Sequence, residues 1–304
     1  MTGATPAMPQ RVLVTGAAGF IGGRLCERLV MDGMEVHAVS RQARSSGGVR
    51  WLQADLSSAA DTRSVFAAVG PDVIFHLAGR PSASRGLDLV LPTLQQNLVA
   101  AVNVMVAAAE VGAPRLVLAG SLEEGDALES DSVLSSPYAV SKQAASAYAR
   151  MLHSLHGLPI VIARIFMVYG PGQTESEKLI PYLIRSLLRG ESPRLGSGER
   201  PVDWVYVDDV VDALVTIGHA PGLVGETIDV GSGELVTIRA LVERVMAILG
   251  TDTAPSFGEL PERKRETVRV ADAVRTRQET GWQARISLED GLRATIEWNR
   301  DRLL

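Results

Sequence analysis

The chain has 304 residues, a net charge of −5 and one cysteine, Cys26. This length can bury one large core or two linked ones, and the negative charge argues against general affinity for nucleic acid or an anionic membrane. One cysteine excludes an internal disulfide framework and suits a reducing cytosol. The start of the chain lacks the positive and apolar regions of a signal peptide, so we expect a cytoplasmic protein.

A glycine-rich turn follows the first predicted strand, 11–15, and precedes a predicted helix, 20–32. In this context Gly16 permits a tight turn, Gly19 lets the backbone approach a pyrophosphate, and Gly22 lets helix and strand pack closely. The helix N-terminus adds free N–H groups and a partial positive charge. The alternative is an ordinary glycine-rich turn. The residues of this turn that we assign to a dinucleotide cofactor are Gly16, Gly19, Phe20, Ile21 and Gly22.

Strand and helix patterns alternate through the first half of the chain. Further strands are predicted near 35–40, 49–53, 73–76, 115–119 and 159–164, and further helices near 59–68, 87–112 and 137–156. This alternation favours an α/β fold with a parallel sheet, in which ligands lie at the carboxyl ends of the strands. The apolar stretch 98–109 is too short to span a bilayer and is interpreted as a buried or dimer-forming helix.

The end of the second predicted strand bears on the choice of cofactor. NAD-specific sites place Asp or Glu there to bind the ribose 2′-hydroxyl, whereas this chain has Ser40 followed by Arg41. An Arg can hold the 2′-phosphate of NADP with paired donors. We therefore expect NADP(H) to be preferred, with NAD(H) as the open alternative. Arg41 can also be a solvated residue that stacks on adenine.

Tyr138 and Lys142 are spaced to share one face of the predicted helix 137–156. A neighbouring cation favours the phenolate, so Lys142 is expected to lower the pKa of Tyr138 and make it a proton donor or acceptor for a carbonyl/alcohol pair. On an isolated helix the same spacing is often mere surface decoration.

With these motifs in place, nearly the whole chain resembles the extended short-chain dehydrogenase/reductases, specifically the NAD(P)-dependent nucleotide-sugar epimerases, dehydratases and reductases. The blocks that carry the resemblance, besides the glycine turn, are Asp55-Leu56, His76 to Gly79, Asn97, Gly120 to Glu124, Ser136 to Lys142, Arg164 to Gly172, Asp203 to Val210, Gly281-Trp282 and Ser287 to Leu292. The remaining cofactor contacts it implies are Asp55, Leu56, Leu77, Ala78, Gly79, Tyr138 and Lys142.

The resemblance implies a Rossmann-like, doubly wound parallel sheet with a smaller C-terminal substrate-binding lobe. The expected limits are 1–169 for the NAD(P)-binding domain, with 204–220 returning to it, and 170–203 with 221–304 for the lobe. It also implies a homodimer formed by helices 87–112 and 137–156.

The expected catalytic residues are Ser121, Tyr138 and Lys142. Tyr138 exchanges the proton with the substrate oxygen, Ser121 orients that oxygen, and Lys142 binds the nicotinamide ribose. Dehydratases of this family carry two acidic residues after the Ser or Thr, but here Leu122 replaces the first and only Glu123 remains as a candidate. Glu123 and Glu124 can equally be a solvated turn.

These residues favour NADPH-dependent reduction of an NDP-4-keto-6-deoxyhexose; the alternatives are a nucleotide-sugar epimerase or dehydratase, and more remotely a non-enzymatic NADP-sensing regulator. The substrate is expected to be a nucleotide-diphosphate sugar. Its candidate diphosphate partners are Lys178, Arg200 and Arg263, each of which can also be a surface charge. Met167 replaces the Asn that usually helps position the diphosphate. The histidine pattern gives no reason to expect a metal site.

Overall fold

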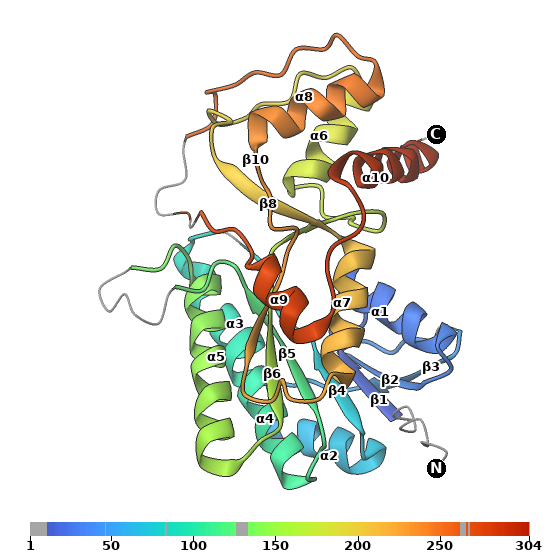
Figure 1. Ribbon diagram of the computed structural model, residues 1–304, viewed down its shortest axis with the longest axis vertical. Helices are drawn as coiled ribbons and strands as arrows, with labels where there is room; N and C mark the ends of the chain where they lie inside the picture. Colours follow the sequence, from blue (N-terminus) through green and yellow to red (C-terminus); the bar gives the residue numbers. More distant parts are fainter. Residues whose placement is uncertain are drawn as a thin grey trace. The chain divides into compact units, whose positions relative to one another are not determined.

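The computed structural model describes residues 11–45, 47–82, 84–125, 133–261, 266 and 268–303. The chain divides into two compact units, whose elements are labelled in Figure 1. The first unit contains the chain up to Arg164 together with Leu214–Ile228, and the second contains Ile165–Ala213 and Asp229–Leu304. The chain therefore leaves the first unit, returns to it and leaves it again.

The first unit is built on a seven-stranded sheet with the strand order β3-β2-β1-β4-β5-β6-β9. The strands are β1 (Arg11–Thr15), β2 (Glu35–Ser40), β3 (Val49–Gln53), β4 (Val73–His76), β5 (Leu116–Ser121), β6 (Ile160–Ile165) and β9 (Thr227–Val230). Strand β1 pairs in parallel with both β2 and β4, so the chain order reverses direction beside β1. The predicted Rossmann-like, doubly wound sheet is confirmed, and its ligand-binding edge is the carboxyl end of β1 and β4.

The helices of this unit begin and end at residues with clear local causes. They are α1 (Phe20–Met31), α2 (Ala59–Val69), α4 (Ala100–Glu110) and α5 (Pro137–His156). The hydroxyl of Ser136 caps α5 by accepting the N–H of Ala139, and Gly157 ends the helix in the left-handed conformation with φ 67°. Together with Pro137 at the first helical position, these residues explain why α5 matches its predicted range.

The predicted helix 87–112 is a composite of four segments. They are η1 (Leu87–Leu89, 3₁₀-helical), α3 (Val90–Thr93), η2 (Leu94–Val99, π-helical) and α4. By length and composition the run Leu87–Glu110 could cross a membrane. However, α4 buries residues such as Val104 and Met105 in the main apolar cluster of this unit, where Phe66 of α2 and Leu13 of β1 also lie. It is a core helix on this side, as the sequence indicated.

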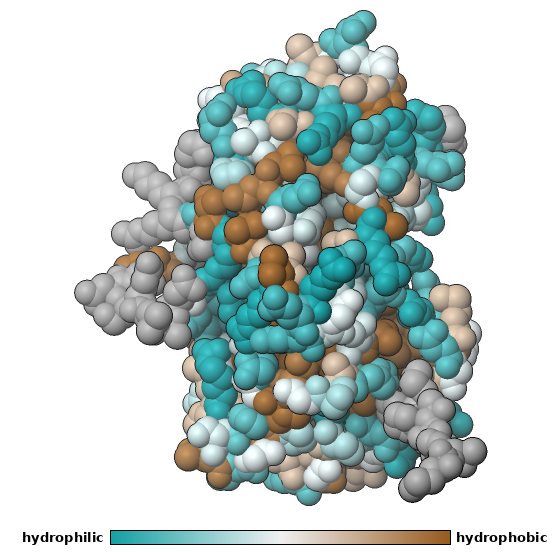
Figure 2. All heavy atoms as spheres, in the orientation of Figure 1, coloured by the Kyte–Doolittle hydropathy of each residue, from teal (hydrophilic) through white to brown (hydrophobic). Residues whose placement is uncertain are grey.

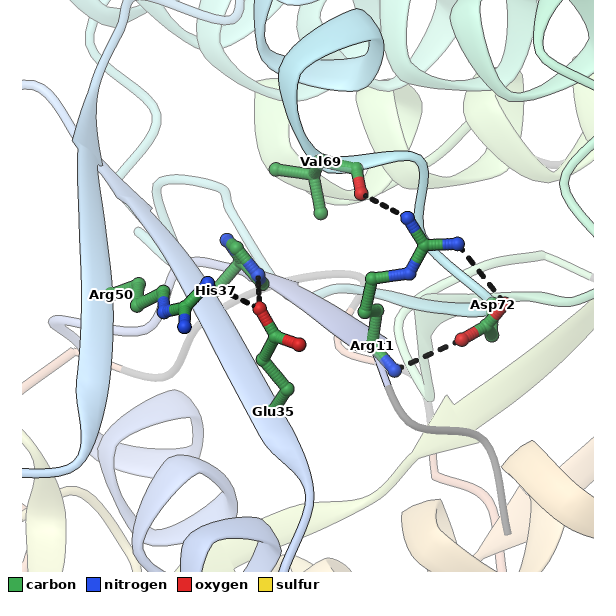
Figure 3. A network of polar contacts seen from close by, with 6 residues as sticks. All are labelled: Arg11, Glu35, His37, Arg50, Val69 and Asp72. Atoms are coloured by element: carbon green, nitrogen blue, oxygen red, sulfur yellow. Dashed lines mark hydrogen bonds and ion pairs between the residues drawn. The ribbon is translucent and has the colours of Figure 1, made fainter. Parts of the chain in front are cut away.

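Polar contacts tie β1, β2 and β3 together near their amino ends, as Figure 3 shows. The backbone N–H of Arg11 donates to the carboxylate of Asp72 over 2.9 Å. The Glu35 carboxylate contacts both His37, at 3.0 Å, and Arg50. The His37 contact is the main cause that lowers the pKa of Glu35. Such exposed pairs stabilise little, and they lie away from the carboxyl edge of the sheet.

The second unit contains a three-stranded sheet with the order β10-β8-β7. Its strands are β7 (Met167–Tyr169), β8 (Pro201–Tyr206) and β10 (Leu235–Thr237), and its helices are α6 (Leu179–Leu188), α8 (Ile238–Leu249), α9 (Ala273–Thr280) and α10 (Leu288–Leu303). Tyr169, Leu183 and Leu241 are central members of its apolar cluster. On the face drawn in Figure 2, the apolar side chains that remain at the surface form separate groups among polar ones.

The division between the units passes through α7 (Val207–His219). The sequence analysis had the chain return to the first domain over 204–220, whereas the structure has it return over Leu214–Ile228. The reason is that β8 pairs with β10 on one side and with β7 on the other, which keeps β8 and the first part of α7 with the second unit.

Candidate active site

The glycine turn after β1 has the geometry that a dinucleotide site requires. Gly16 has φ 71°, and a Cβ there would lie 2.6 Å from the backbone of Leu77 and Ala78 at the end of β4. A Cβ on Gly22 would lie 2.2 Å from the carbonyl oxygen of Gly16. Only glycine lets strand, turn and helix approach this closely.

The N-terminus of α1 is free of competing groups. Gly19 is its N-cap and provides no side-chain hydrogen bond, and the first turn holds no acidic residue. The backbone N–H groups of this turn can therefore bind an anion such as a pyrophosphate. Phe20 and Ile21, which were assigned to the cofactor, form the start of this helix.

The carboxyl ends of β1 and β4 are joined directly. The N–H of Leu77 donates to the Thr15 carbonyl over 3.2 Å, and the N–H of Ala78 donates to the Thr15 hydroxyl over 3.3 Å. That hydroxyl also bonds Nδ1 of His76, which is buried, over 2.7 Å. Burial lowers the pKa of His76 to about 3, so this imidazole is neutral. Gly79 follows and completes the predicted β4 segment.

The residues expected near the adenosine lie after β2 and β3. Ser40 is half-buried at the end of β2, and Arg41 is exposed. The Asp55 carboxylate accepts hydrogen bonds from the N–H and hydroxyl of Ser57, at 3.0 and 2.8 Å. These bonds lower the pKa of Asp55, and the charge of Arg41 lowers it further, which places Arg41 and Asp55 close together. Leu56 is buried in the core of the unit.

Ser121, Tyr138 and Lys142 come from two adjacent elements. Ser121 ends β5, while Tyr138 and Lys142 lie one turn apart on α5. The Lys142 ammonium is buried and donates to the Ala119 carbonyl over 2.8 Å. It lies 6.0 Å from the centre of the Tyr138 ring. The two predicted proton-handling side chains therefore share one face of α5, as their spacing indicated.

The expectation that Lys142 lowers the pKa of Tyr138 is wrong for this structure. Burial is the largest influence and raises the pKa of Tyr138 well above its usual value. A polar contact with the Ser121 hydroxyl lowers it in part, while the charges of Glu123 and Glu124 raise it. The helical spacing was right, but the sequence does not reveal how deeply the phenol is desolvated.

Asn97 connects the loop after β4 to the helix that carries the catalytic pair. It is buried in the π-helical segment, where its Oδ1 accepts the N–H of Arg80 over 2.7 Å. Its Nδ2 donates to the Ser141 hydroxyl over 3.0 Å, and that hydroxyl donates to the carbonyl of Tyr138 over 2.8 Å. The resemblance pointed to Asn97, but no sequence pattern predicted the π turn that directs it here.

The two glutamates after Ser121 have different environments. Glu123 is half-buried; its N–H donates to the Ser121 hydroxyl over 3.2 Å, and its carboxylate accepts the hydroxyl of Ser136 over 3.4 Å. Glu124 is only 4% exposed, and its carboxylate accepts the N–H of Ser121 over 2.8 Å. Leu122, between them and Ser121, is buried. The alternative of a solvated turn is therefore wrong for Glu124.

The candidate diphosphate partners belong to the second unit. Lys178 is the N-cap residue of α6 and is half-buried. Arg200, immediately before β8, forms an ion pair with Glu266 at 2.9 Å. Arg263 lies outside the described residues. Within the described part of the chain, no cluster of three or more His, Cys, Asp or Glu side chains could hold a metal ion.

Comparison with known proteins identifies the class to which this fold and site belong. Residues 12–231 match the model of the NAD dependent epimerase/dehydratase family. The chain is 31% identical to UDP-glucose 4-epimerase of Mycolicibacterium smegmatis, over 96% of this chain and 99% of the relative. It is 30% identical to dTDP-glucose 4,6-dehydratase of Streptomyces griseus, over 96% of this chain and 94% of the relative.

A solved structure, MoeE5 in complex with UDP-glucose and NAD, shares 32% identity and superposes with a TM-score of 0.84. The match covers 97% of this chain and 100% of that one. The chain belongs to the NAD dependent epimerase/dehydratase family, and it is an enzyme of the extended short-chain dehydrogenase/reductase type. The relatives favour the two alternatives, epimerisation and dehydration, over the expected NADPH-dependent reduction.

Proposed function

We propose that this enzyme is a nucleotide-sugar 4-epimerase that acts on a UDP-hexose. The observation that carries this proposal is the pairing of Ser121 and Tyr138 with a buried Leu122. Epimerisation of a hydroxyl-bearing carbon exchanges one proton at one oxygen, so a single positioned phenol suffices. Support for the substrate comes from the names of the relatives: an epimerase of UDP-glucose, and a solved structure that holds UDP-glucose and NAD.

In this mechanism Ser121 donates a hydrogen bond to the oxygen on C4 of the sugar and orients it. Tyr138 accepts the hydroxyl proton as the alcohol becomes a ketone. After the sugar has turned, Tyr138 returns the proton to the same oxygen as the alcohol of opposite configuration forms. A bound oxidised nicotinamide would supply a reversible hydride acceptor and a positive charge that favours the phenolate. There is no net oxidation, because the proton and hydride both return to the substrate.

Dehydration is the second candidate, and Glu123 is the observation that favours it. Removal of water from adjacent carbons needs a base for the carbon-bound proton and an acid for the departing hydroxyl. Glu123 can serve as one of these groups, but the aliphatic side chain of Leu122 cannot transfer a proton. The site therefore supports epimerisation better than dehydration.

The cofactor turn fits a dinucleotide, with Gly16, Gly19 and Gly22 holding the phosphates against α1. We retain NADP(H) as the preferred form, because Ser40 and Arg41 place no carboxylate beside the ribose 2′-position. This choice does not affect the proposed reaction, since the 2′-phosphate lies outside the nicotinamide ring. We assign the second unit to the sugar nucleotide and place the enzyme in the cytoplasm.

We also propose that the enzyme is a homodimer. Exposed apolar residues lie along two neighbouring helical runs of the first unit: Leu87, Val90, Leu91 and Leu94 on one, and Val140, Tyr148, Met151 and Leu155 on α5. Apolar surface of this extent favours a partner, and a second copy offers the matching face. Sedimentation is expected to give twice the monomer mass. A monomer at micromolar concentration would contradict the dimer.

The test of the reaction is incubation in D₂O with UDP-glucose, UDP-galactose, dTDP-glucose and 4-keto sugar nucleotides, each with NAD and with NADPH. We expect interconversion of the UDP-sugar C4 epimers, no deuterium on sugar carbon and no net change in cofactor absorbance. A 4-keto-6-deoxy product that carries deuterium at C5 would identify a dehydratase instead. Stoichiometric NADPH consumption with a 4-keto sugar would restore the reductase interpretation.

A further inference from the structure

Glu124 is a buried acidic residue that the proposed mechanism does not use. Its carboxylate lies beneath the end of β5 and accepts the backbone N–H of Ser121 over 2.8 Å. The missing side chain of Gly120 leaves room for it, because a Cβ at Gly120 would lie 2.8 Å from Oε1 of Glu124. The other side of that space is closed by Ile162 of β6, at 3.0 Å from the same Cβ. The packing therefore fits a carboxylate against the residue that orients the substrate oxygen.

Charged and polar groups face this carboxylate from the elements packed around it. Lys142 and Ser146 face it from α5, and Arg164 faces it from β6. Ser121 contributes its N–H from β5. An ion removed from water is costly unless a partner of opposite charge and hydrogen bonds compensate it. Glu124 and the buried ammonium of Lys142 provide such compensation for each other.

The surroundings of Lys142 contain no other described carboxylate that acts on it so directly. Its ammonium bonds the carbonyl of Ala119, and the nearby imidazole of His76 is neutral. Burial lowers the pKa of Lys142, and the charge of Glu124 raises it. Tyr138 differs in this respect, because the charges of both Glu123 and Glu124 raise its pKa.

We propose that Glu124 is a positioning residue that fixes the backbone of Ser121 and keeps the buried Lys142 charged, and that it thereby sets the pH range in which the site works. It acts through these neighbours and does not itself contact the substrate. The activity test rests on the proposed epimerase function, whereas the placement of Glu124 against Lys142 does not.

The first experiment compares Glu124→Gln with Glu123→Gln in the pH dependence of kcat. Glutamine keeps the shape of the side chain and an oxygen for the Ser121 N–H, but removes the charge. Loss of the Glu124 charge lowers the pKa of both Tyr138 and Lys142, so both limbs of the profile move to lower pH, by roughly one unit or more. Glu123→Gln is the matched control and is expected to move only the acidic limb, which reports Tyr138. Unmoved limbs in Glu124→Gln, or identical shifts in both variants, would overturn the proposal.

A second experiment does not depend on activity. Urea unfolding is measured for the wild type, Glu124→Gln, Lys142→Met and the double variant. If the two charges compensate each other, the double variant loses less stability than the sum of the single variants. Additive losses would reject the pairing even if the epimerase assignment is correct. If Glu124→Gln alone does not fold, the proposal requires that the double variant folds, and a double variant that also fails would overturn it.

If no sugar nucleotide is turned over while the unfolding cycle shows coupling, the proposed function fails and the role of Glu124 in the site stands. The two results are therefore distinguishable.

Discussion

The candidate site of the first unit and the candidate substrate residues of the second unit were predicted from the same sequence with different outcomes. In the first unit the backbone places the residues, because Gly16 touches the end of β4 and Asn97 bonds the loop after β4 and α5. In the second unit the candidates are long cationic side chains, and Arg200 is already paired with Glu266. Backbone geometry restricts a site far more tightly than a charged side chain does, which has several rotatable bonds.

The largest effect expected within this comparison is that of Tyr138→Phe, which removes one hydroxyl from the well-defined site. A positioned acid or base contributes about 10²–10⁴-fold to the rate, so kcat is expected to fall by that factor. The readout is turnover of UDP-glucose by NMR, with cofactor affinity measured by calorimetry. Tyr148→Phe, an exposed tyrosine on the same helix, is the matched control. Full activity of Tyr138→Phe would reject the catalytic assignment.

A smaller effect is expected for Arg200→Gln in the second unit. If Arg200 binds the diphosphate, loss of a charge-assisted hydrogen bond raises KM by about tenfold or more while kcat is largely preserved. Arg239→Gln is the control, because Arg239 also forms an ion pair, with Glu199 at 3.2 Å. An unchanged KM for Arg200→Gln would assign Arg200 a structural role in its pair with Glu266.

At the other end of the first unit, Arg41→Ala tests the cofactor phosphate. We expect the affinity for NADPH to fall by about tenfold, as for loss of one charge-assisted contact, and the affinity for NADH to change little. Arg44→Ala provides a control, since Arg44 lies over the ring of Trp51 at 5.8 Å. Calorimetry that finds equal affinities of the wild type for NADPH and NADH would reject the NADP preference.

The smallest effect is expected for Glu123→Gln at pH 7. The proposed epimerase does not use this carboxylate as a base, so kcat is expected to stay within about threefold, whereas a base in dehydration would be worth about 10²-fold or more. Turnover at fixed pH gives the answer. A loss as large as that of Tyr138→Phe would promote dehydration over epimerisation.

Much of the fold followed from local patterns in the sequence. Strands that end in Ser40 and Ser121 were recognisable because they are short, apolar and followed by polar residues, and parallel pairing then brings their ends to one edge. The i, i+4 spacing of Tyr138 and Lys142 fixed their common helix face. These features depend on the period of an element and on turn chemistry, which a single sequence records.

What could not be predicted depends on packing. Glu123 and Glu124 are identical neighbours in the sequence, yet one is half-buried and the other is enclosed next to Gly120. The pKa of Tyr138 depends on desolvation, which is a property of the surrounding elements. The limits of the two units depend on which strands flank β8. None of these has a signature within a few residues of the chain.

The π-helical segment Leu94–Val99 has a consequence for insertions and deletions. A π turn is an α-helix that accommodates one additional residue, and each residue of an α-helix advances the side chains by about 100°. Removing one residue from this segment would therefore rotate Leu87 and Leu91 about the helix axis relative to the core side chains of α4. The segment acts as a phase adjuster between an outward apolar face and an inward one, so we expect substitutions there to be tolerated better than any change in length.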